Sequence, residues 1–155
     1  MSGGDAFGIE EAVALAERAH AGQVDKAGAP YIEHVRRVVA AVAPHGATVQ
    51  VVAALHDVVE DTSLTLDDLA VLGVPQDIVQ AIDALTHRAG ESYETAVARA
   101  AAHPIARLVK RADYADNSDE ARLALLSPGI AEKLRAKYAS AWRILSSADA
   151  EGERR

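Results

Sequence analysis

The chain has 155 residues, a length typical of one domain, and 16 Lys and Arg against 23 Asp and Glu give it a formal net charge of −7. An acidic chain lacks the basic surface that binding to a nucleic-acid backbone requires, so we expect no nucleic-acid partner. Half of the residues are hydrophobic and none is a cysteine, which predicts a buried core and excludes disulfides, thiolate metal sites and cysteine nucleophiles.

The sequence carries no signal for a membrane. Its first ten residues, MSGGDAFGIE, lack the basic and apolar regions of a secretion signal. No apolar run approaches the roughly 18 residues of a membrane span. We therefore expect a cytoplasmic protein without a membrane partner.

Helical spacing of apolar residues governs the first half of the chain. It predicts helices over 9–21, 30–44 and 47–61, and the third is apolar on nearly all sides, as in a buried central helix. A short helix is expected within 62–73, with Thr65 as its N-cap and two aspartates in its first turn.

The second half continues the pattern. A helix begins at Pro75, and further helices are expected over 92–103, 104–119 and 130–145. The fold class is therefore all-α, a single compact bundle of about eight helices, with an N-terminal tail at 1–8, one domain over 9–148 and a polar C-terminal tail at 149–155. The apolar face of 130–145 suits either the core or a subunit interface, which leaves a homodimer open.

Four ionisable residues gather at the end of the central helix, in the string LHDVVEDT. Helical geometry sets His56 above Glu60 and Asp57 above Asp61, because each pair is four residues apart. Burying such groups beside apolar residues is costly unless a cation compensates them. Imidazole with carboxylate is a ligand set for Mn, Fe(II), Zn or Mg. The alternative is a solvated helix end.

Two more residues are candidates for the same ion. His34, in PYIEH, borders the apolar stripe of the second helix, and Asp113, in VKRADYADN, follows the stripe of the seventh. Three helices would then converge on one metal. By contrast, His45, His87 and His103 stand at helix ends or beside glycine or proline, and we interpret them as satisfied polar groups.

These residues follow the order H…HD…D of the HD-domain metal phosphohydrolases. The strings AERAHAGQ, KAGAPYIEH, AALHDVVEDT, LTHR and VKRADYADN, which span His20 to Asn117, resemble the hydrolase domain of the RelA/SpoT enzymes and the stand-alone small alarmone hydrolases. The resemblance implies a helical HD domain that holds one Mn²⁺ and hydrolyses the 3′-pyrophosphate from the guanosine alarmones ppGpp and pppGpp.

The resemblance also implies roles for individual residues. The metal ligands would be His34, His56, Asp57 and Asp113. The catalytic acidic pair would be Glu60 and Asp61, which act on the attacking water or the leaving group. The substrate-binding residues would be Lys26, Asn117, Lys110 and Tyr31.

The chain departs from the family's pattern at the substrate-binding positions. Asp25 stands where alarmone hydrolases usually have an arginine, and the family's ADRLHN is here ADYADN, with Tyr114 for Arg and Asp116 for His. Two alternatives therefore stand beside an alarmone hydrolase. One is an HD phosphohydrolase that acts on another nucleotide, and the other is a non-catalytic module that binds a metal or a nucleotide. The acidic pair argues against the second, because simple binding does not need it.

Overall fold

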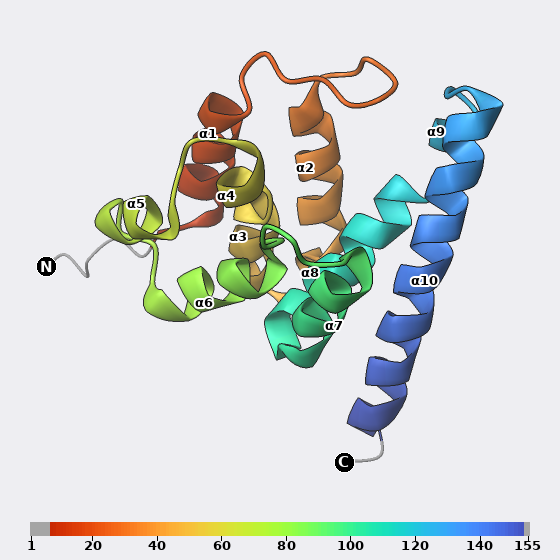
Figure 1. The fold of residues 1–155 in the computed structure, drawn as a ribbon. Coiled ribbons are helices and arrows are strands. Elements are labelled where there is room, and N and C mark those ends of the chain that lie inside the picture. Colours follow the sequence, from red (N-terminus) through yellow and green to blue (C-terminus); the bar gives the residue numbers. More distant parts are fainter. Residues whose placement is uncertain (1–6, 154–155) are drawn as a thin grey trace, which may run out of the picture.

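The most apolar helix, α3 (Ala47–Leu55), lies among α1 (Ile9–Ala19), α2 (Tyr31–Ala41), α6 (Gln76–Leu85) and α8 (Pro104–Asn117) (Figure 1). The structure is a computed structural model that describes residues 7–153, and within that range it contains helices and no strand. Nearly every residue of α3 from Val49 onward is buried, as the sequence predicted for a central helix. The all-α expectation is thus confirmed.

Short elements connect the longer helices. They are the 3-10 helix η1 (Ala43–His45), α4 (Val58–Asp61), α5 (Leu66–Val71) and α9 (Glu120–Leu123), whereas α7 (Tyr93–Ala102) is as long as α6. The hydroxyl of Thr65 accepts from the Asp68 amide at 3.0 Å, so the predicted cap of α5 is confirmed. The sequence did not predict α9, which has four residues.

The last helix, α10 (Pro128–Glu153), runs along one side of the bundle and packs against α7 and α8 (Figure 1). Its 26 residues extend past the helix expected over 130–145 and enter the expected tail. Within this extension the carboxylate of Asp149 pairs with Arg111 of α8 at 2.5 Å. Residues 1–6 and 154–155, which belong to the expected tails, lie outside the described range.

The helix predicted over 47–61 is interrupted, and α3 and α4 are separated by His56 and Asp57. Asp57 has φ −109° and ψ −2°, a sparsely populated backbone region that is frequent at active sites. Adjacent residues of a continuous helix do not face each other. The break lets both side chains point to one place, so the expected stacking of His56 over Glu60 is wrong: His56 is buried and Glu60 is exposed.

None of the helices within residues 7–153 has both the length and the apolar character needed to cross a membrane.

Candidate metal centre and its pocket

Four of the side chains singled out in the sequence converge at the break between α3 and α4. His34 comes from α2, His56 and Asp57 from the break, and Asp113 from α8, and one ligand atom of each lies within 4.8 Å of the others. The Nε2 atom of His56 is 2.9 Å from Asp57 Oδ2, and the Nε2 atom of His34 is 3.0 Å from Asp113 Oδ1. The structure thus brings together all four expected ligands.

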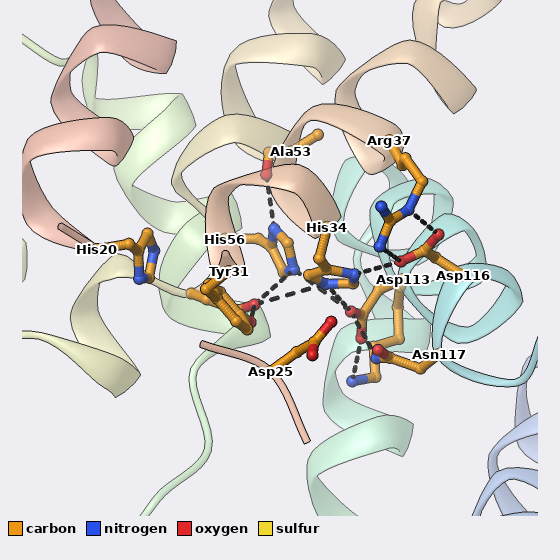
Figure 2. Close-up of polar contacts among 12 residues, drawn as sticks. His20, Asp25, Tyr31, His34, Arg37, Ala53, His56, Asp113, Asp116 and Asn117 are labelled. Carbon is orange, nitrogen blue, oxygen red and sulfur yellow. Dashed lines mark hydrogen bonds and ion pairs between the residues drawn. The ribbon is translucent and has the colours of Figure 1, made fainter. Parts of the chain in front are cut away.

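The hydrogen bond that Nδ1 of each histidine makes determines whether Nε2 of the neutral ring carries a proton or a free lone pair. Nδ1 of His56 donates to the Ala53 carbonyl at 2.6 Å, and Nδ1 of His34 donates to Asp116 Oδ2 at 2.6 Å (Figure 2). In the neutral rings both Nε2 lone pairs therefore face carboxylate oxygens.

Such an arrangement of lone pairs and carboxylates needs a positive charge at its centre. Nε2 of His56 is buried and has no hydrogen-bond partner within residues 7–153. Two imidazole nitrogens and two carboxylates are a ligand set for a divalent transition metal, and a hydrogen bond on the remote histidine nitrogen is the usual support for such ligands. The residues present therefore fit a divalent cation.

Protons would compete with the metal for this site. Burial lowers the pKa of His56, but the carboxylates of Asp57 and Asp113 outweigh it and hold that pKa well above its usual value. The pKa of His34 is also raised, because the hydrogen bond and charge of Asp113 exceed the effect of burial. A metal-free centre therefore carries protons that a metal ion must displace.

We expect metal binding to be linked to pH. Since the raised histidine pKa values favour protonation, lowering the pH from 8 to 6 should weaken Mn²⁺ binding, and binding near neutral pH should release protons. Calorimetric titration in two buffers of different ionisation enthalpy measures both effects. An affinity that does not change across this range would contradict the assignment of His34 and His56 as ligands.

The expected acidic pair lies beside the cluster on α4. Carboxylate oxygens of Asp57, Glu60 and Asp61 lie within 4.8 Å of one another. Burial, together with the charges of Asp57 and Glu60, raises the pKa of Asp61 to about 6. Glu60 Oε1 accepts from the His87 amide at 2.7 Å. A carboxylate with a pKa near 6 is suited to take up a proton at neutral pH.

Three of the expected substrate-binding residues contact the cluster itself. Tyr31 donates its hydroxyl to Asp57 Oδ2, Lys110 Nζ donates to Asp113 Oδ2 at 3.1 Å, and Asn117 Nδ2 donates to Asp113 Oδ1 at 3.0 Å. In this structure they orient the two aspartates. Substrate contacts by these residues remain a prediction.

A pocket of about 510 Å³ opens beside the cluster and is lined by both acidic and basic residues. Lys26, the fourth expected substrate-binding residue, lines it from the loop between α1 and α2. Lys110 and Lys137 flank the Tyr93 ring, with Nζ 5.7 and 4.5 Å from its centre. Burial and then the charges of Lys26 and Lys110 lower the pKa of Lys137. The pocket therefore combines an acidic side with a group of lysines.

The sequence analysis missed the support of His34. Asp116 accepts from His34 Nδ1 through Oδ2, and Arg37 Nε donates to Asp116 Oδ1 at 2.6 Å (Figure 2). Asp116 appeared in the sequence only as a departure from the family's pattern. Its position three residues after Asp113 on one helix was a usable signal, because such residues are neighbours on the helix surface.

Replacing Asp116 by Asn should weaken metal binding by roughly 10- to 100-fold, the usual effect of removing the partner of a metal-bound histidine. Titration of the metal-stripped protein with Mn²⁺ measures this. Asp83→Asn is a matched control, since Asp83 of α6 makes an exposed ion pair with Arg88. Equal affinities of the two variants would show that Asp116 does not support His34.

The two other departures have structural partners. Asp25 Oδ1 accepts from the amides of Ala27 and Ala29 at 2.9 and 3.0 Å. Tyr114 stacks on Trp142 of α10, with ring centres 5.5 Å apart. Neither residue supplies a cation to the pocket. His103, interpreted as a satisfied polar group, caps α8 by accepting from the Ile105 and Ala106 amides. His87 is also satisfied, because its Nε2 donates to the Glu91 carbonyl at 2.8 Å, and it lines the pocket as well.

Comparison with known proteins bears on the fold. No model of a protein family matches the sequence. Among solved structures, one described as a metazoan ortholog of SpoT that hydrolyses ppGpp and plays a role in starvation responses is similar to this chain. The TM-score is 0.75 at 24% sequence identity, and the match covers 88% of this chain and 84% of that one. The chain thus has the fold of that SpoT ortholog, an all-α bundle as the sequence predicted.

Proposed function

We propose that this protein is a metal-dependent phosphohydrolase and that its substrate is a guanosine alarmone, ppGpp or pppGpp, from which it releases the 3′-pyrophosphate. The observation that carries the proposal is the convergence of two Nε2 lone pairs and two carboxylates beside the acidic pair of α4. The resemblance of PYIEH and ALHDVVEDT to alarmone hydrolases, and the shared fold with a protein described as hydrolysing ppGpp, support the choice of substrate.

The residues would divide the chemistry between them. A bound divalent ion, proposed to be Mn²⁺, supplies a more acidic water and offsets charge on the phosphoryl oxygens. Asp61 would accept the proton that this water loses as its oxygen bonds to phosphorus. The bond from phosphorus to the ribose 3′-oxygen breaks, and that oxygen takes up a proton. From ppGpp the products are GDP and pyrophosphate.

The lysines beside the pocket favour a substrate with several phosphates. The lowered pKa of Lys137 reflects burial and then repulsion from Lys26 and Lys110. A polyanion in the pocket would relieve this repulsion, because each lysine would gain an opposite charge. The cytoplasmic location and the possible homodimer remain predictions.

Product analysis tests the proposed function. The Mn²⁺-loaded protein is incubated with ppGpp and with a panel of mono-, di- and triphosphate nucleotides, with and without a chelator. We expect GDP and pyrophosphate from ppGpp, and no products when the chelator is present. If ppGpp yields neither GDP nor pyrophosphate, the result would contradict the alarmone assignment.

A second candidate is a phosphohydrolase for another nucleotide. It is favoured by Asp25 and Tyr114, because the alarmone hydrolases that the chain resembles usually have arginine at both positions and here each side chain is held by neighbouring groups. In the same assay, orthophosphate from another nucleotide together with intact ppGpp would establish this candidate.

A further inference from the structure

The segment between α1 and α2, residues 20–30, is called here the pocket loop. It carries Lys26 and is organised around Asp25, whose amide donates to the Ala29 carbonyl at 2.8 Å and whose Oδ1 accepts from two loop amides. Because these bonds make the loop one unit around Asp25, a contact that holds Asp25 also helps to position Lys26, together with the bond from Gln23 Nε2 to the Asp61 carbonyl at 3.0 Å.

That contact comes from a residue 97 positions away in the sequence. Arg122 of α9 donates through Nη2 to Asp25 Oδ2 at 2.9 Å, and through Nη1 to Asp116 Oδ2 at 2.6 Å. One guanidinium therefore bridges the pocket loop and the carboxylate that holds His34. A planar fork of donors is suited to joining two carboxylates in a fixed geometry.

Arg122 is itself well positioned. Its neighbour Leu123 is buried against Ala131 and Leu134 of α10, and Asp119 caps the single turn of α9. Nη1 of Arg122 also donates to the Asp116 carbonyl at 3.1 Å, which ties the guanidinium to the end of α8. The side chain is 23% exposed and lines the pocket.

We propose that Arg122 is a positioning residue that couples the pocket loop to the metal centre, through Asp25 on one side and Asp116 and His34 on the other. The inference rests on the metal site of the proposed function and adds that loop placement and metal affinity depend on each other. Coupling of this kind is reciprocal, so a metal ion at the centre stabilises the loop as much as the ordered loop favours the metal ion.

The direction in which one substitution changes the Mn²⁺ affinity separates a positioning role of Arg122 from the effect of its charge. Arg122→Met removes a positive charge near a cation site, so Coulomb's law alone predicts tighter Mn²⁺ binding. Loss of positioning predicts weaker binding, by about three- to tenfold, less than for a direct partner of the ligand. Arg122→Lys keeps the charge but not the fork and should also weaken binding.

The Asp25→Asn variant tests the other end of the bridge. Asn retains Oδ1, the acceptor for the Ala27 and Ala29 amides, and replaces Oδ2 with an amino group that cannot accept from Arg122. The loop should therefore keep its internal bonds and lose its link to α9, so this variant remains informative if Arg122→Met folds poorly.

The experiment is a double-mutant cycle on the full chain with two measurements. Mn²⁺ affinity is measured by titrating the metal-stripped protein, and loop opening by the rate at which trypsin cleaves after Lys26, which is exposed. Each single substitution should weaken Mn²⁺ binding and speed cleavage, and the double variant should be no worse than Arg122→Met alone. In the wild type Mn²⁺ should slow cleavage, and in Arg122→Met this protection should be reduced.

Matched controls are Arg135→Met, which breaks the exposed pair with Glu120, and Asp83→Asn, and neither should change the two measurements. Tighter or unchanged Mn²⁺ binding in Arg122→Met, strictly additive effects, or wild-type affinity in Arg122→Lys would overturn the proposal. If the wild type binds no Mn²⁺, the proposed function fails as well. If it binds Mn²⁺ without coupling, only this inference fails.

Discussion

The Asp57→Ala variant is expected to lose both metal binding and hydrolysis. Asp57 Oδ2 faces His56 Nε2 at 2.9 Å and accepts the Tyr31 hydroxyl, so its removal takes away one of the two carboxylates that the centre offers to a cation. Removing only the support of a ligand costs roughly 10- to 100-fold in affinity, so loss of a ligand should cost more than about 100-fold. Mn²⁺ titration and the ppGpp assay measure the two losses.

A second substitution separates loss of the ligand from loss of structure. Asp57→Asn keeps the shape of the side chain and an oxygen that can accept from Tyr31, so the fold should persist while metal affinity still falls. Asp83→Asn makes the same chemical change in an exposed pair and should leave both measurements unchanged. Wild-type Mn²⁺ binding by Asp57→Asn, with intact helical content, would remove Asp57 from the ligand set.

The sequence predicted the helices well wherever a local signal determined them. Thr65 caps α5 as predicted, and α6 and α7 lie within the helices expected from Pro75 and over 92–103. Such features depend on residues three or four apart in the chain, which the sequence displays directly. The end of α10 was missed, and there Asp149 pairs with Arg111 of α8, a contact between residues far apart in the sequence.

The residues of the metal centre were predicted, but their geometry was not. A continuous helix over 47–61 was the natural expectation from its apolar composition, yet it would have turned His56 and Asp57 in different directions. The break at these residues depends on tertiary partners, among them the Tyr31 hydroxyl on Asp57 and the approach of Asp113 from α8. Sequence periodicity carries no information about such partners.

The surroundings of the centre were the least predictable part. From the sequence, Asp25 and Asp116 were interpreted as departures at substrate-binding positions, because the sequence shows which residue is present but not which residues it contacts. In the structure Arg122 bridges both of them, and Asp116 also holds His34. Asp25, Asp116 and Arg122 therefore belong to one hydrogen-bond network around His34, a proposed metal ligand.

The second large effect is expected for the acidic pair, where turnover should fall and metal binding should persist. Asp61→Asn removes the carboxylate that lies beside Asp57 without altering any of the four proposed ligands. Loss of a general base typically costs roughly 10²- to 10⁴-fold in rate. We expect a fall of this size in kcat, with Mn²⁺ affinity within a few-fold of the wild type. Glu60→Ala should likewise retain metal and lose turnover.

The pH profile distinguishes a proton acceptor from a residue that only shapes the pocket. Burial and the charges of Asp57 and Glu60 raise the pKa of Asp61 to about 6, and a nearby cation would lower it. Asp61 accepts a proton only when ionised, so the wild-type rate should fall as the pH drops through 6 or slightly below. In Asp61→Asn this acid limb should disappear, measured at saturating Mn²⁺ so that metal loss does not imitate it. An unchanged limb, or a rate within threefold of the wild type, would transfer the role of base to Glu60.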